Sequence, residues 1–162
     1  MYFDSYNRAS AVAYAHRWAY GRNPRFYDYE AIGGDCTNFA SQCLYAGSGV
    51  MDYTPTYGWY YIDANRKSPS WTGVEYLYNY LTRERTSLGP AAREVSRSEM
   101  QPGDIVQLSF DGVRFAHSPI VVELSARDLL LAAHSYDADY RPLATYEYRA
   151  IRFLHVTGVW KE

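Results

Sequence analysis

The stretch GGDCTNFASQCLYAG, residues 33–47, holds both cysteines of this 162-residue chain, Cys36 and Cys43. Two thiols so placed could form a disulfide, bind a metal, fill a core or include a nucleophile. The glycine pair that precedes Asp35 breaks the backbone, and Asp35 is a favourable helix N-cap. No helix breaker follows until Gly47, so we expect a helix that begins at Cys36 and ends at Gly47.

A helix in this position disfavours both the disulfide and the metal site. Seven residues of helix separate two Cα atoms by roughly 10 Å, whereas a disulfide needs them closer than about 7 Å. The spacing of the two thiols is also not that of a zinc site, so we expect no metal and no cofactor. Cys43 has apolar neighbours, and we interpret it as a small buried side chain.

Cys36 has a different setting, because it would stand at the N-terminal end of the helix. Unpaired N–H groups and the helix dipole stabilise a thiolate there and lower the pKa of the thiol. The same N–H groups can hold an oxyanion. We therefore interpret Cys36 as a nucleophile, with a structural cysteine as the alternative.

A cysteine nucleophile usually works with a general base, and the chain has four histidines. His117 precedes one apolar segment and His134 ends the next, so an antiparallel hairpin would bring both to one edge of a sheet. We expect Cys36, His117 and His134 to meet as a catalytic set. His16, within a helix, and His155, on a late strand, are expected to be structural.

The elements that must position these residues change in kind along the chain. A helix is expected over residues 5–20, and another begins with a capping box at Thr72 and Glu75. After about residue 100 the pattern is that of strands, with a hairpin turn at Asp111-Gly112. Helices first and an antiparallel sheet second predict an α+β fold.

Composition narrows the classes of function. The net charge of -2 offers no basic surface for nucleic acid, and no run of about 18 apolar residues predicts a membrane span. The first residues lack the basic start and apolar core of a signal peptide. This favours either a cytoplasmic protein or a secreted or cell-wall protein whose leader has been removed.

Aromatic residues are abundant, with 18 Tyr, 6 Phe and 4 Trp. Several lie in the irregular connection over residues 47–71, where Trp59 and Trp71 are candidates for the wall of a substrate groove, with ordinary packing as the alternative. Three further residues are candidates for substrate binding: Asp35, Asn38 and Tyr29. Asp35 could instead cap the helix, and Asn38 could instead anchor the helix to the loop that follows it.

A resemblance to a known family, extending from about Tyr6 to Val156, rests on six motifs that occur in this order: SYNRASAVAYAHRWA, GGDCTNFASQCLYAG, SPSWTGV, PGDIVQL, AHSPIVV and AAHSYD. Together they resemble the bacterial putative amidase domain family, among the papain-like cysteine hydrolases that include the CHAP and NlpC-like cell-wall enzymes. The resemblance implies a single papain-like domain over residues 1–162. It also implies Cys36 as nucleophile, His117 as general base and His134 as the residue that orients the base.

One position departs from the papain pattern. Papain places a Gln that donates to the oxyanion six residues before its cysteine, and this chain has Glu30 there, which cannot donate when it is ionised. The Cys36 N–H, with the hydroxyl of Tyr27 or Tyr29, is the expected substitute.

The sequence thus predicts a cysteine-dependent amide hydrolase, and the resemblance implies bacterial cell-wall peptide or peptidoglycan as substrate. A module of the same fold that binds cell-wall peptide or glycan without cleaving it is the alternative. Acyl transfer from the same cysteine would fit the same residues.

Overall fold

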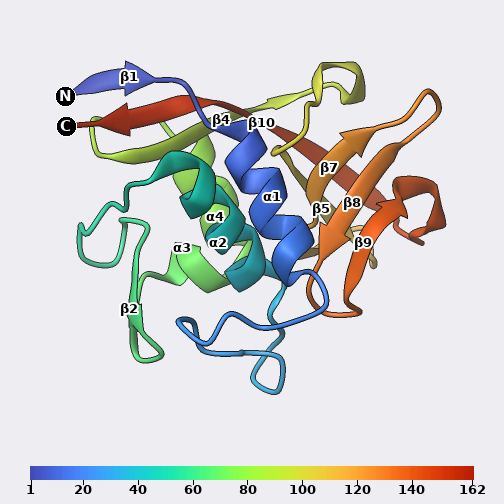
Figure 1. Ribbon diagram of the computed structural model, residues 1–162, viewed down its shortest axis with the longest axis horizontal. Helices are drawn as coiled ribbons and strands as arrows, with labels where there is room; N and C mark the ends of the chain where they lie inside the picture. The colour runs from blue at the N-terminus through green and yellow to red at the C-terminus, as the bar shows by residue number, and fades with distance from the viewer.

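The computed structural model describes all 162 residues and places the main helices before most of the sheet (Figure 1). The helices are α1 (Arg8–Trp18), α2 (Cys36–Ser48), α3 (Pro69–Thr72) and α4 (Val74–Thr82), with 3-10 turns η1 (Arg97–Glu99) and η2 (Leu143–Thr145). The strands are β1 (Tyr2–Asp4), β2 (Tyr61–Asp63), β3 (Arg66–Lys67), β4 (Gly89–Val95), β5 (Ile105–Ser109), β6 (Phe115–His117), β7 (Ile120–Leu124), β8 (Leu129–Ala133), β9 (Ala138–Pro142) and β10 (Ala150–Lys161). The predicted α+β class is confirmed.

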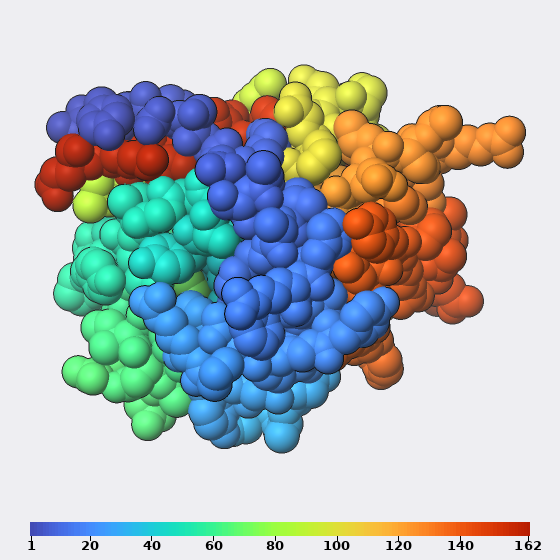
Figure 2. All heavy atoms as spheres, in the orientation of Figure 1, coloured from blue at the N-terminus to red at the C-terminus, as the bar shows by residue number.

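The main sheet has eight strands and is antiparallel at every pairing. Its path runs β1-β10-β5-β7-β8-β9, with β4 beside β10 and β6 beside β5. The long strand β10 pairs with β1, β4 and β5 and so joins both ends of the chain to the middle of the sheet. Figure 2 shows the first residues, in dark blue, lying against the red C-terminal strand.

Two apolar clusters pack on the two faces of this sheet. The larger, of 25 buried residues, lies between the helices and the sheet, and the smaller, of 8, lies on the other face. Strand β5 contributes to both because side chains alternate along a strand. Ile105 packs under the helices, whereas Val106 and Leu108 belong to the second cluster. This alternation decides which residues can reach Cys36.

Helix α2 is the central helix, and 11 of its 13 residues are buried. It begins at Cys36 as expected but continues past Gly47 to Ser48, so the prediction that Gly47 ends it is wrong. Gly47 instead allows Tyr6 to pack against the helix, since a Cβ there would collide with the Tyr6 ring. The helix ends at Gly49, which has a φ of 73°.

The start of α4 also differs from the prediction. Thr72 is the last residue of α3, and Gly73 is the N-cap of α4 with no side-chain cap, so the capping box of Thr72 and Glu75 does not form. Glu75 instead forms an ion pair with Arg152 of β10, at 2.8 Å. This pairing ties the start of α4 to β10.

The hairpin predicted at Asp111-Gly112 is confirmed. Asp111 Oδ1 accepts the N–H groups of Val113 and Arg114, both at 2.8 Å, in the turn that joins β5 to β6. The segment RFAHSPIVVELS, expected as one strand, is divided at Ser118 and Pro119 into β6 and β7. The short strand β6 is the one that passes Cys36.

The aromatic connection over residues 47–71 is folded into the core rather than exposed as a wall. Trp59 and Trp71 are fully buried, and their ring centroids lie 4.8 Å apart. The indole N–H of Trp59 donates to Ser41 Oγ, and that of Trp71 donates to Asn38 Oδ1. Both tryptophans therefore anchor the connection to α2.

The longest helices are too short and too polar to cross a lipid bilayer.

Candidate active site

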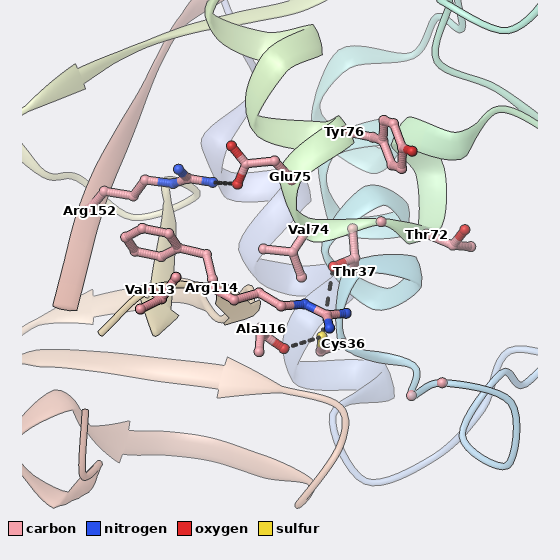
Figure 3. Close-up of a pocket in the computed structure, with 14 residues that line it drawn as sticks. Cys36, Thr37, Thr72, Val74, Glu75, Tyr76, Val113, Arg114, Ala116 and Arg152 are labelled. Carbon is pink, nitrogen blue, oxygen red and sulfur yellow. Dashed lines mark hydrogen bonds and ion pairs between the residues drawn. The ribbon is translucent and has the colours of Figure 1, made fainter. Parts of the chain in front are cut away.

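Cys36 opens into a cavity of about 620 Å³ bounded by the start of α2, the start of α4 and strand β6 (Figure 3). The lining residues include both the thiol and the glycine pair before it, and they are Gly33, Gly34, Cys36, Thr37, Thr72, Gly73, Val74, Glu75, Tyr76, Val113, Arg114, Phe115, Ala116 and Arg152. A cavity of this size can hold a small ligand or a short length of peptide.

The thiol of Cys36 lies between the helix and the strand. Its Sγ is 3.7 Å from Thr37 Oγ1 and 3.8 Å from the carbonyl oxygen of Ala116, and only 8% of the residue is exposed. Burial raises the pKa of this thiol, while hydrogen bonds from Thr37 and from the Ser118 backbone act in the opposite direction. The expectation of a lowered pKa is wrong, because desolvation of the thiolate exceeds the stabilisation by these groups.

The glycine pair before Cys36 shapes the approach to the helix. Gly33 and Gly34 have φ angles of 89° and 99°, a region that residues with a Cβ rarely adopt. This backbone brings Asp35 under the helix and leaves the cavity without a side chain at that point. The two glycines are thus required by backbone conformation, and a Cβ at Gly34 would also lie only 3.2 Å from Ser135 Oγ.

Asp35 occupies the N-cap position, but its carboxylate does not cap the helix. Oδ1 accepts from the Tyr29 N–H and from Asn38 Nδ2, and Oδ2 contacts His134. The first backbone bond into the helix comes from the N–H of Phe39 to Asp35 O. The N–H groups of the first turn therefore have no oxygen acceptor within the protein, which suits them to hold an oxyanion beside Cys36.

Both ring nitrogens of His134 have hydrogen-bond partners within the protein. Its Nδ1 is 2.5 Å from Asp35 Oδ2, and its Nε2 is 2.8 Å from the carbonyl oxygen of Trp18. The ring also stacks on Phe39, with centroids 4.0 Å apart, and is almost completely buried. Because a carbonyl only accepts, Nε2 carries a hydrogen and donates it to Trp18 O.

His117 lies in a different environment. Its ring packs beside Phe110 and Tyr146, with centroids 6.3 Å and 5.9 Å away, and neither ring nitrogen has a hydrogen-bond partner in the protein. Burial, and then the charge of Arg141, lowers the pKa of His117 to about 4. The imidazole is therefore neutral near pH 7.

The strand register explains why the histidines separate. Ile120 of β7 faces Ala132 of β8, so continuing the antiparallel register places Ser118, and not His117, opposite His134. Residues directly opposite share a face of the sheet. Ser118 accordingly points toward the helices, where its Oγ is 3.2 Å from Thr37 Oγ1, and His117 points to the other face.

The hairpin thus brings the backbones of His117 and His134 to one end of the sheet, as expected, but their rings lie on opposite faces. No hydrogen bond joins either ring to the other or to the thiol of Cys36. The structure instead brings together Cys36, Thr37 and Ser118 on one side and Asp35 and His134 on another.

The buried position of His117 predicts a pH-dependent stability. Since its pKa falls from an ordinary value of 6.5 to about 4, the unfolded chain binds the extra proton between these values, and stability falls as the pH falls through that window. His117→Phe removes this proton uptake and suits the aromatic surroundings. Between pH 7 and pH 4.5 the wild type should lose about 2 kcal/mol more unfolding free energy than the variant.

Urea unfolding at the two pH values measures this difference. All other titrating groups are shared by the two proteins, so they cancel in the comparison. Equal losses in both proteins would show that the proton uptake belongs to another group.

The remaining candidates do not reach the cavity that holds Cys36. Asn38 donates to Tyr27 O and accepts from the Trp71 indole, so it anchors α2 to the neighbouring segments. Trp59 and Trp71 are core residues. Tyr29 donates its hydroxyl to Ala64 O. Tyr29 does, however, line a second cavity, described below.

Glu30, at the papain Gln position, also faces away from the thiol. Its Oε2 accepts from the N–H of Asp35 and from Ser135 Oγ. Glu30 therefore supports the loop before α2 and offers no donor to an oxyanion. The backbone N–H groups of the helix remain as the donors.

The other three expectations about thiols and imidazoles agree with the structure. Both cysteines are free, and Cys43 is fully buried, which raises the pKa of its thiol well above the ordinary value. His16 pairs with Asp139, and His155 pairs with Asp104, both through Nδ1 at 2.8 Å. Each of these two imidazoles therefore has a carboxylate partner and lies outside the lining of the cavity at Cys36. No group of three or more His, Cys, Asp or Glu side chains is placed to hold a metal ion.

A polar chain that the sequence analysis missed extends from Ser118 along the cavity. Ser118 Oγ accepts from Gln107 Nε2 at 3.2 Å, and Gln107 Oε1 accepts from Arg152 Nε at 2.8 Å. Arg152 then reaches Glu75. Strict alternation along residues 105–109 could have placed Gln107 on the helix side, but its partners are distant in sequence.

Comparison with known proteins identifies a family and a relative. The model of the family described as "Putative amidase domain" matches residues 5–157. A protein of Bacillus subtilis (strain 168) with the name "Uncharacterized protein YhbB" is 36% identical over 139 residues, which is 84% of this chain. The chain spans 43% of the length of that relative. No solved structure matches the chain. The chain belongs to the putative amidase domain family.

Proposed function

We propose that this chain is a cysteine-dependent amide hydrolase of papain-like arrangement, with Cys36 as its nucleophile. One observation carries the proposal. The thiol of Cys36 and the uncapped first turn of α2 lie at the same cavity, so a nucleophile and the donors for an oxyanion are already adjacent. Membership of the amidase family supports amide hydrolysis as the reaction.

The chemistry follows from these groups. The thiol gives its proton to a base, and Sγ forms a bond to the amide carbonyl carbon while the carbonyl oxygen becomes an oxyanion. The N–H groups of the first turn of α2 stabilise this oxyanion. The C–N bond then breaks and the amine leaves with a proton. Water attacks the resulting thioester, which releases the carboxylic acid and restores the thiol.

For the base we propose His117, in a conformation that turns its ring toward the cavity. In its buried position the pKa of His117 is about 4, so the ring is neutral near pH 7, and turning it out of this apolar site would remove the desolvation that weakens it as a base. Its neighbour Ala116 already contacts the thiol through its carbonyl oxygen. The change of face is confined to β6, a strand of three residues whose pairing with β5 is irregular between Leu108 and Ser109.

For His134 we propose a positioning role that acts through Asp35 and not through His117. Its ring links the carboxylate of Asp35 to the carbonyl of Trp18, so it fixes the residue that directly precedes the nucleophile. Both nitrogens are occupied in this task. The first turn of α2 is thereby held in place without a side-chain cap, which leaves its N–H groups available.

For the substrate we propose an extended peptide of the bacterial cell wall. A second cavity, lined by Tyr27, Tyr29, Ile32, Ala64, Asn65 and Lys67, shares Gly33, Gly34 and Thr72 with the first. A binding surface therefore continues on both sides of the glycine pair. An elongated chain can cross it with the scissile amide at Cys36.

Digestion of purified peptidoglycan tests the proposal. The protein should release new amino groups, and mass spectrometry of the soluble products should show fragments that have gained one water across an amide bond. Sedimentation with peptidoglycan but no release of amines would contradict hydrolysis and favour a binding module. Products in which an added amine replaces water would show acyl transfer.

A further inference from the structure

The cavity at Cys36 holds three charged side chains, and they differ in their partners. Glu75 and Arg152 form an ion pair at 2.8 Å. Arg114 also lines the cavity, but its guanidinium has no ion pair and no hydrogen bond in the protein. The cavity therefore carries one cation that the protein leaves uncompensated.

Arg152 is fixed by its surroundings and cannot serve as a free cation. Its guanidinium donates to Gln107 and Glu75, and its central carbon lies 3.6 Å from the ring centroid of Tyr78 and 4.0 Å from that of Phe115. These contacts hold the guanidinium against two aromatic rings as well as its two acceptors. Arg152 thus belongs to the wall of the cavity.

Arg114 is placed differently. Its backbone N–H is held by Asp111 in the turn before β6, whereas its side chain is exposed. Ala116, two residues further along, contacts the thiol of Cys36 through its carbonyl. Figure 3 shows the Arg114 side chain directed across the cavity toward the end where Cys36 lies. A hydrogen-bonded turn therefore presents an exposed cation to the same cavity as the nucleophile.

We propose that Arg114 is a specificity-determining residue that binds a substrate carboxylate close to the scissile amide. The proposal rests on the proposed hydrolase function and names the chemical class of its substrate. The substrate would be an amide that carries a free carboxylate beside the bond to be cleaved. A guanidinium presents parallel N–H donors that match the two oxygens of a carboxylate. The one carboxylate that lines the cavity, that of Glu75, is paired with Arg152, so a ligand carboxylate would be the partner of Arg114.

Binding can be measured without any turnover in the Cys36→Ala protein. The side-chain Nε–Hε resonance of Arg114, identified by its loss in Arg114→Gln, is followed by NMR during titration with N-acetylglycine or N-acetylglycinamide. The acid should shift this resonance with saturation, and the amide should not. Equal responses to the two compounds, or no response to the acid, would overturn the proposal.

Alkylation of Cys36 gives a second measurement that needs no knowledge of the substrate. Iodoacetate and iodoacetamide react with the same thiolate, so the ratio of their rates removes any effect of the thiol pKa. Arg114→Gln should lower the iodoacetate-to-iodoacetamide ratio by roughly 1.5- to fivefold, the range expected for an exposed charge pair. An unchanged ratio would overturn the proposal.

Two further variants make the comparison specific. Arg127→Gln removes the same charge from the exposed turn between β7 and β8, far from the cavity lining, and should leave the ratio unchanged. Arg114→Lys keeps the charge without the paired donors and should give an intermediate ratio. A protein that releases no amines from any substrate would contradict the proposed hydrolase but would still give both of these readings for Arg114.

Discussion

Cys36→Ala should abolish amide hydrolysis while the protein remains folded. The covalent step has no other thiol in the cavity to carry it, so release of amines from peptidoglycan should fall by roughly 10⁴-fold or more. Only 8% of Cys36 is exposed, and its thiol makes two long contacts, at 3.7 Å and 3.8 Å. Removal of the sulfur therefore costs little packing, and circular dichroism and the urea midpoint should change little.

Cys43→Ala is the matched control, because it removes the other thiol from the same helix. Cys43 is fully buried and distant from the lining of the cavity. Its loss leaves a small void and should lower stability modestly, with hydrolysis retained. Retained hydrolysis in Cys36→Ala, or its loss in the still folded Cys43→Ala protein, would contradict the assignment of the nucleophile.

Asp35→Ala should be the most destabilising substitution near the site. Asp35 is completely buried, and its carboxylate serves Tyr29, Asn38 and His134. The alanine leaves these three donors without an acceptor, and loss of one partner of a buried pair typically costs about 3–5 kcal/mol. That is a large part of the stability of a domain, about 5–15 kcal/mol.

Asp35→Asn separates the charge from the hydrogen bonds. The amide oxygen can still accept from Tyr29 and Asn38, and the amide N–H can donate to Nδ1 of a neutral His134. We therefore expect Asn to restore most of the stability that Ala loses, as measured by urea unfolding. A loss below about 1 kcal/mol for Asp35→Ala, the ordinary value of a single hydrogen bond, would contradict this account.

Sequence reasoning could predict the position of Cys36 because local signals determine it. A glycine pair and an N-cap residue precede a run without helix breakers, and these features act within a few residues. The class of fold follows in the same way from the change in hydrophobic period after residue 100. The end of α2 was misplaced because a tertiary contact, Tyr6 on Gly47, overrides the local preference of glycine.

The partners of Cys36 could not be predicted because a strand register decides them. Hairpin topology brings His117 and His134 to one end of the sheet, but a shift of one residue moves a side chain to the other face. Ser118 consequently lies with His134 on the helix side. The pKa of Cys36 was misjudged for a related reason, since sequence shows the helix terminus but not the burial that opposes its effect.

The role of Asp35 also depends on tertiary contacts that the sequence does not show. An aspartate before a helix usually caps it, and only the fold shows that loop residues and a histidine about 100 positions away use the carboxylate instead. Trp59 and Trp71 are similar cases. Their abundance in one connection predicts an ordered segment, but whether they face solvent or core depends on α2, which supplies the acceptors for both indole N–H groups.

Alkylation of the wild-type protein with iodoacetamide, with peptide mapping and amine release measured in the same samples, tests the central claim most directly. The account predicts that Cys36 is modified well before Cys43, because Cys43 is fully buried and its thiol has the more strongly raised pKa. Hydrolysis of peptidoglycan should fall in proportion to the modified fraction of Cys36. Equal, slow labelling of both cysteines, or full hydrolysis after complete modification of Cys36, would contradict it.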